Sequence, residues 1–329
     1  MSKGNGFGAL ERIAKSSAGR SIVPVLGSGF VTQAVHQGAL AASASERPKP
    51  VDWMSLLRGV ALEMELEAAT RSIKIDVPGQ TTLLWDAMVT ELAMRAPRTR
   101  AAHHCEARMR QSVARRLRED VATVELSRPF VQSFLDLGFN DVLMFNFDSV
   151  LLPPRKRPTH RVRGAARRAS LAAKVDETTI WFPHGHLSDP ESIVLGAHAY
   201  GVRIAAMQAA FDAHARRRAP RPSSSLDTWV ATVLERPLLF VGLSLTREEW
   251  TIWWLLSERA RFLARRPRAD RPPAFVFARR PSPAEPMESH AAFSTLVRAC
   301  ELLGLSLLEF ADFAGGWKKL EKALGWTRR

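Results

Sequence analysis

Cysteine and long apolar runs are scarce in this sequence. Only two of the 329 residues are cysteine, Cys105 and Cys300, and no CxxC pair occurs. This scarcity argues against a disulfide framework and against a cysteine zinc site. No apolar run reaches the ~18 residues that a membrane helix needs, and the first residues show no apolar signal-peptide core. We therefore expect a cytoplasmic protein without a membrane partner.

Acidic residues are outnumbered, so the net charge is +14 and the sequence pI is about 10.8. Such a balance can indicate a polyanionic partner, although an Arg-, Ala- and Pro-rich composition can also produce it. The segment 155–168, RKRPTHRVRGAARR, holds seven Lys or Arg residues and no acid. A solvated loop and a loop that contacts phosphate or nucleic acid both fit this segment.

Short apolar segments alternate with helical patterns along the chain. Several of these segments are apolar throughout, which is typical of parallel strands covered on both faces. The pattern predicts an α/β fold, a Rossmann-like parallel sheet with helices on both faces, in one domain spanning 1–329. A helical insertion is expected at about 52–137 within it. The predicted strands are 21–30, 141–148, 178–185, 192–196, 236–245, 272–278 and 305–310.

Glycine or polar residues lie at the carboxyl ends of four of the predicted strands. In open parallel sheets, ligands bind beyond the carboxyl ends of the strands. These residues are therefore expected on the ligand-facing edge of the sheet. They are Gly27, Ser28, Gly29, Asn146, Asp148, His184, Gly242 and Ser244.

Each of these signals also has a structural interpretation. Gly27-Ser28-Gly29 suits a pyrophosphate at a helix N-terminus, but the third glycine position of the fingerprint holds Thr32, and a tight turn fits equally well. Asp148 could cap the following segment. A single His at a strand end, such as His184, is often structural, although its pKa range suits a general base.

The order and spacing of these motifs are more specific than any one of them. The sequence contains PVLGSGF, VDWMSLL, MFNFDSVL, FPHGHLSDPESIVLG and LLFVGLSLTREEW, in that order, over roughly residues 21–256. In this it resembles the sirtuin-like NAD-binding family, especially the bacterial branch found in antiphage defence.

The resemblance implies a role for each matching residue. Asn146 would hold the nicotinamide ribose or an attacking water, and His184 would act as a base toward a ribose hydroxyl or water. Asp148 would support this loop and the nucleotide. The cofactor-binding residues would be Gly27, Ser28 and Gly29 at the pyrophosphate, with Gly242 and Ser244 at the adenosine side.

The implied function is a metal-free NAD⁺ hydrolase, a regulated effector that cleaves the nicotinamide–ribose bond of NAD, its substrate. The resemblance also implies a separate activating protein partner or self-assembly into a homo-oligomer. Phe145, Phe147 and Val31 depart from the family pattern of Thr, Tyr and Ser. Two alternative functions therefore remain: an inactive NAD- or nucleotide-binding subunit, and a zinc-free deacylase. The sequence also does not decide whether NAD cleavage would end in hydrolysis or in cyclisation.

Overall fold

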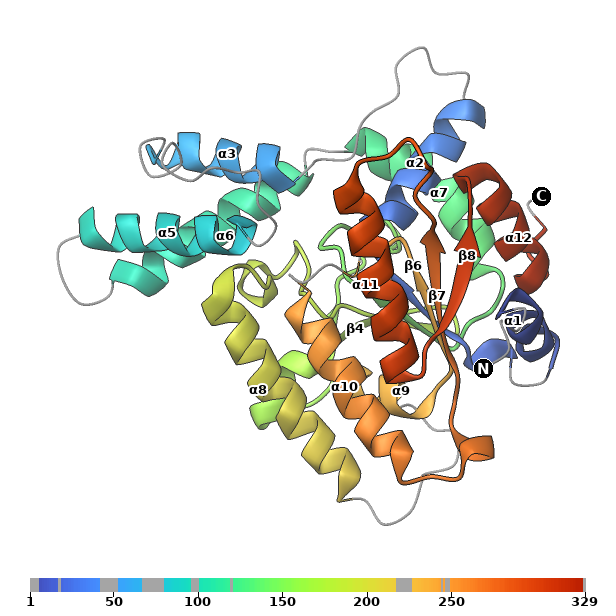
Figure 1. Cartoon of the computed structure of the whole chain (residues 1–329). Helices are drawn as coiled ribbons and strands as arrows, with labels where there is room; N and C mark the ends of the chain where they lie inside the picture. Colours follow the sequence, from blue (N-terminus) through green and yellow to red (C-terminus); the bar gives the residue numbers. More distant parts are fainter. Residues whose placement is uncertain are drawn as a thin grey trace.

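Parallel strands form the centre of the fold in the computed structural model (Figure 1). Within the described residues, eight strands form one sheet in the order β3-β4-β5-β2-β1-β6-β7-β8. The strands from β5 to β8 in this order are all parallel, and helices cover both faces, so the predicted α/β class is confirmed. The structure describes residues 6–16, 19–41, 53–66, 80–95, 101–118, 121–216, 227–243, 245 and 249–327.

The six parallel strands match predicted segments, because each is a short apolar run between turn signals. They are β1 (Val23–Leu26), β2 (Asp141–Met144), β5 (Thr178–Trp181), β6 (Leu238–Val241), β7 (Ala274–Arg279) and β8 (Ser306–Phe310).

Two antiparallel strands extend the sheet beside β5. They are β3 (Thr159–His160) and β4 (Leu171–Val175), and β4 pairs with β5 through a tight turn. The sequence did not predict them, since β3 is only two residues long and β4 is rich in Ala and Lys, which are depleted in strands.

The predicted strand at 192–196 is wrong. The 3₁₀ helix η3 (Pro190–Ser192) opens this segment, and an extended loop follows. Instead of joining the sheet, Val194 donates its backbone N–H to the carbonyl of His184 over 2.8 Å. The β-branched residues Ile193 and Val194 are buried by this loop, which explains why the segment resembles a strand.

On one face of the sheet, four helices enclose an aromatic core (Figure 1). Phe30, Phe134 and Trp317 pack there, and the ring centroids of Phe30 and Phe134 lie 4.9 Å apart. The helices are α1 (Gly6–Lys15), α2 (Ser28–Ala41), α7 (Val121–Leu135) and α12 (Phe313–Leu324).

The other face carries a second core, in which Trp181, Trp229 and Ile252 are buried. Its helices are α8 (Gly196–Ala215), α9 (Trp229–Glu235), α10 (Trp250–Ala264) and α11 (Met287–Leu303). Trp253 and Trp254 pack against this core, whereas Trp250 is 63% exposed at the start of α10.

Three further helices lie beside one end of the sheet and share a core of their own (Figure 1). They are α3 (Trp53–Glu63), α5 (Gln80–Arg95) and α6 (Ala101–Arg118). Phe147, Leu187 and Ile193, from loops that follow β2 and β5, belong to this core and join the three helices to the sheet. None of the helices in the described ranges is long and apolar enough to cross a membrane.

The contact between α2 and α7 depends on Gly38. A Cβ atom added there would lie 1.7 Å from the Leu126 carbonyl oxygen, whereas one added at Gly201 of α8 would meet nothing within 4 Å. We expect Gly38→Ala to lower the free energy of unfolding by ~1–3 kcal/mol, because the helices must separate.

The matched control Gly201→Ala should raise that free energy by ~0.5–1 kcal/mol, because alanine loses less backbone entropy in a helix. Urea unfolding of both variants measures these changes. Equal effects of the two substitutions would show that the close contact at Gly38 is not a constraint.

Candidate functional site

The carboxyl ends of β1, β2, β5 and β6 surround a cavity of about 200 Å³. Four of the residues singled out in the sequence line it together: Ser28, Asn146, His184 and Gly242. They meet because parallel neighbouring strands end at the same edge of the sheet. Helices α3, α5 and α8 add Leu57, Thr81, Thr82, Gly196 and Tyr200 to the lining.

The glycines between β1 and α2 interlock with the end of β6. Gly27 donates its N–H to the Val241 carbonyl over 3.1 Å, and Gly29 donates to the Gly242 carbonyl over 2.9 Å. A Cβ atom at Gly27 would lie 2.6 Å from the Gly242 oxygen, and one at Gly242, whose φ is +71°, would lie 2.1 Å from the Phe30 nitrogen. These glycines therefore allow a close contact between two strand ends, and Ser28 is left at the cavity as the first residue of α2.

His184 lies in an aromatic environment at the end of β5. Its ring packs edge-on against Phe145, at 4.8 Å between centroids, and against Tyr200, at 5.8 Å. The residue is only 6% exposed, and its Nε2 lies 3.1 Å from the Thr251 hydroxyl of α10. Burial, with a smaller effect of the Arg203 guanidinium, lowers the pKa of His184 to about 3, so the ring is neutral at neutral pH.

Asn146 and Asp148 have different positions after β2. Asn146 lines the cavity, and no hydrogen bond from the described residues holds its side chain. Asp148 does not line the cavity, and its Oδ1 accepts the Val150 N–H over 3.1 Å, so it stabilises the turn after the strand. The bond to Val150 is consistent with the capping interpretation of Asp148, and of these two residues only Asn146 lines the cavity.

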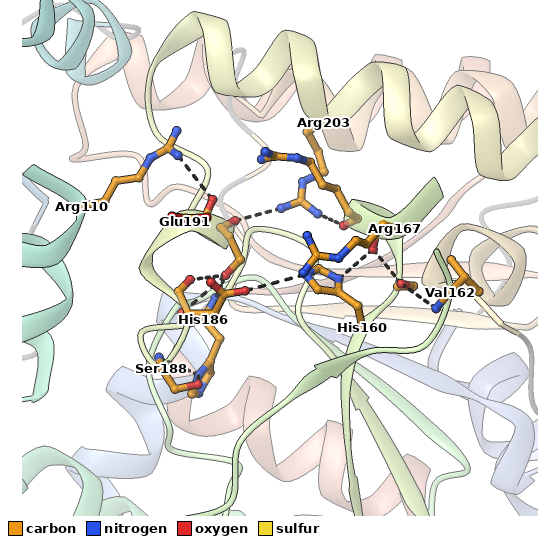
Figure 2. A network of polar contacts seen from close by, with 12 residues as sticks. Arg110, His160, Val162, Arg167, His186, Ser188, Glu191 and Arg203 are labelled. Carbon is orange, nitrogen blue, oxygen red and sulfur yellow. Dashed lines mark hydrogen bonds and ion pairs between the residues drawn. The ribbon is translucent and has the colours of Figure 1, made fainter. Parts of the chain in front are cut away.

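His186 does not line the cavity and lies beside Ser188 in the polar network of Figure 2. Its Nδ1 lies 2.8 Å from the Ser188 hydroxyl and its Nε2 lies 3.3 Å from the Ser149 hydroxyl. Its ring packs against Phe182, which belongs to the core on the opposite face of the sheet from Phe145. Burial, followed by the charge of Arg118, lowers the pKa of His186 to about 4, and its contacts are those of a structural histidine.

Sequence reasoning missed several residues of the cavity. Tyr200, the single tyrosine of the chain, lies on α8 and contacts His184, and Glu249, just before α10, brings a carboxyl group to the lining. Thr251 also escaped notice, because nothing in a helical pattern distinguishes a threonine that bonds a distant histidine. Ser244 lies outside the described residues.

Helix α5 closes one side of the cavity and is fixed to α8 by a carboxylate. Asp86 accepts the Ala197 N–H, in the first turn of α8, over 2.8 Å. A Cβ atom at Gly196, whose φ is +77°, would lie 2.2 Å from Asp86 Oδ1, so glycine is required for this approach. Burial raises the pKa of the Asp86 carboxyl, while the bond from Ala197 opposes that rise.

No group of three or more His, Cys, Asp or Glu residues that could hold a metal ion occurs in the described part of the chain. Cys105 and Cys300 are buried free thiols, and burial raises the pKa of Cys300 to about 11.

Comparison with known proteins adds one match to this geometry. Residues 141–297 match the family described as SIR2-like domain, a range that runs from β2 through most of α11 and includes Asn146, His184 and Gly242. A search of curated proteins found no match. The matched segment of this chain is therefore similar to a SIR2-like domain, which supports a sirtuin-like family and an activity related to NAD.

Proposed function

We propose that this protein is an NAD⁺ hydrolase that cleaves the nicotinamide–ribose bond. The observation that carries the proposal is the presence of Asn146 and His184 in one cavity, beside the N-terminus of α2, at the carboxyl edge of a sheet. The match to a SIR2-like domain supports NAD as the ligand. The positive dipole at the N-terminus of α2 suits the pyrophosphate of a dinucleotide, while the Gly29 and Phe30 N–H groups of this first turn are donated to the Gly242 and Gly27 carbonyls.

In this proposal each residue has a defined task. Ser28, with the interlocked Gly27 and Gly29, would place the pyrophosphate at α2, and Asn146 would hold the ribose or the attacking water. Neutral His184 would accept a hydrogen bond from a ribose hydroxyl or that water.

Bond cleavage develops positive charge on the ribose ring. Glu249 is the carboxyl group that lines the cavity, and it would stabilise that charge. Gly242, together with Ser244, would adjoin the adenosine part, and Asp148 would act through the turn that it stabilises. All of this chemistry is carried by the chain's own side chains.

The small cavity supports regulation of this activity. Its volume of about 200 Å³ is below the ~300–1,000 Å³ usual for small-molecule sites, so a whole dinucleotide would enter only if the lining helices moved. We therefore propose a cytoplasmic effector of bacterial antiphage defence, within a single domain. Its helical insertion, expected at about 52–137, would control access through α3 and α5, which line the cavity. A separate protein partner or assembly into a homo-oligomer would widen the site.

Hydrophobic surface beside the site supports assembly. Trp250 is exposed at the start of α10, next to Glu249 in the chain, and large exposed aromatic residues are typical of protein interfaces.

A second candidate function is an inactive NAD-binding subunit, favoured by Phe145 and Phe147 at positions where the family usually has Thr and Tyr.

Removal of either polar residue separates these functions. We expect Asn146→Ala and His184→Ala each to lower nicotinamide release from NAD by ~100-fold or more, because a positioned base contributes about that factor and misplacement of the reacting groups costs a similar one. The exposed histidine of α11 gives the control His290→Ala, which should retain full activity. Thermal unfolding of each variant confirms that it is folded; a folded Asn146→Ala protein with wild-type turnover would refute the site.

The pH profile provides an independent check on His184. A base works in its deprotonated form, and a pKa of about 3 keeps that form dominant well below the ordinary histidine range of ~6.5. As the pH is lowered from 8 to 5, kcat/KM for nicotinamide release should therefore not fall, over the range in which the protein stays folded. A tenfold loss between pH 6.5 and 5.5 would mean that the base is a group with an ordinary pKa.

Activity should rise with protein concentration if assembly opens the site. We expect Trp250→Ser to weaken both self-association and activity, measured by light scattering and by nicotinamide release over a dilution series. Leu302→Ser on α11, where the leucine is 75% exposed, is the matched control and should change neither. Full specific activity in a dilute, demonstrated monomer would contradict this prediction.

A further inference from the structure

The segment between β2 and β4 presents a strongly basic surface that the cavity does not use. All seven of its Lys and Arg side chains are exposed, and none of the residues 155–168 lines the cavity. Among the described residues, none of the seven forms an ion pair through its side chain. We call this the basic surface: Arg155, Lys156, Arg157, Arg161, Arg163, Arg167 and Arg168.

A network of hydrogen bonds fixes the backbone beneath this surface (Figure 2). The Arg167 carbonyl accepts the Ser170 hydroxyl over 2.6 Å and contacts His160 Nδ1 at 2.8 Å. The Ser170 hydroxyl in turn accepts the Val162 N–H over 3.2 Å. Residues 160–170 therefore form a closed loop that holds its cationic side chains on a fixed frame, unlike a freely solvated charged run.

Arg203 of α8 attaches this frame to the rest of the fold (Figure 2). It is 2% exposed and donates to the Arg168 carbonyl and, over 3.0 Å, to the Ser192 carbonyl. Its guanidinium group donates to carbonyl oxygens, and no carboxylate of the described residues pairs with it. The positive charge of Arg203 therefore adds to that of the region. Burial, followed by the charges of Arg168 and Arg110, lowers the pKa of Arg203 to about 9.

Asp189 and Glu191 are acidic residues that lie near the surface. Asp189 lies 3.7 Å from His160, and Glu191 faces Arg110 of α6, whose own ion-pair partner is Glu106 at 2.6 Å. Arg110 is close enough to Arg168 for their charges to interact, but its own charge is paired with Glu106.

The chemistry of the surface identifies its partner. Protein interfaces have an apolar, aromatic core, whereas no large apolar side chain is exposed between residues 153 and 170. Proteins that hold single strands use aromatic residues on which bases stack, and this surface has none. Guanidinium groups on a fixed frame, without stacking residues, suit the phosphates of a duplex backbone, which are contacted independently of sequence.

We propose that the basic surface binds double-stranded nucleic acid through its phosphates. The part of the surface from Arg161 to Arg168 lies on the same edge of the sheet as the cavity, because η2 (Gly164–Ala169) immediately precedes β4, whose first residues pair with the end of β5. A bound duplex would thus lie beside the loop that carries His184. The inference concerns binding alone and does not depend on the proposed hydrolase activity.

The test replaces four exposed cations that make no side-chain hydrogen bond or ion pair with the described residues. The variant is Lys156→Ser, Arg157→Ser, Arg163→Ser and Arg167→Ser. The matched control removes one lysine and three arginines elsewhere: Lys319→Ser, Arg12→Ser, Arg265→Ser and Arg268→Ser. The two variants have the same net charge. Fluorescence anisotropy with a labelled 20-base-pair DNA duplex, from 50 to 200 mM salt, compares each of them with the wild type.

We expect the wild type to bind the duplex, with the log–log salt slope of the first variant smaller by about 3 to 4, since each lost phosphate contact removes about 0.9. Its affinity should fall by at least ~100-fold at 50 mM salt, while the control stays near the wild type. The proposal would be overturned if the control lost as much affinity as the first variant, or if the single strand bound more tightly than the duplex. It would also be overturned if polyglutamate bound the wild type and lost as much affinity in the first variant as the duplex does. The absence of duplex binding would overturn it too.

Discussion

The close approach of Gly242 to the turn between β1 and α2 is the constraint on which the candidate site depends. Two backbone hydrogen bonds join these strand ends, and side chains larger than hydrogen would separate them. Because the contact fixes the end of β6 against the start of α2, it also fixes Ser28 and Gly242 at one cavity. The glycines thus serve the packing of the protein, and this packing positions the N-terminus of α2 at the cavity.

The burial of His184 is the second determinant of the site. Phe145 and Tyr200 remove water from the ring, and Thr251 occupies one of its nitrogens. A histidine held neutral can accept a proton, but a pKa of about 3 makes it a weak base. Under the proposed function, the burial of this ring and the small cavity would restrain the resting enzyme, as NAD depletion would require.

The sequence predicted the central sheet and the residues at its edge because those signals are local. An apolar run followed by Gly or Asn marks a buried strand and its end, so β1, β2, β5 and β6 were found together with Ser28, Asn146 and His184. The antiparallel β4 was missed because its composition, Leu-Ala-Ala-Lys-Val, carries no strand signal. Residues 192–196 were misread because burial in a loop selects the same β-branched residues as burial in a strand.

The rest of the site could not be predicted, since it depends on contacts between distant segments. Thr251 meets His184 across 67 positions of the chain, and Asp86 meets Ala197 across 111. His184 and His186 have different surroundings because of the path of one loop. It places the His184 ring at the cavity and the His186 ring against the core on the opposite face of the sheet. Spacing in the sequence cannot distinguish these outcomes.

The claim that the cavity is an NAD site with a neutral His184 can be tested directly by NMR of ¹⁵N-labelled histidine side chains, with His184→Gln used for assignment. At pH 6 the account predicts neutral-ring shifts for His184, which move on addition of saturating NAD while those of His186 stay in place. A charged His184 ring at pH 6 would contradict the claim. So would a His184 signal that does not move when NAD is added, once calorimetry has shown that NAD binds.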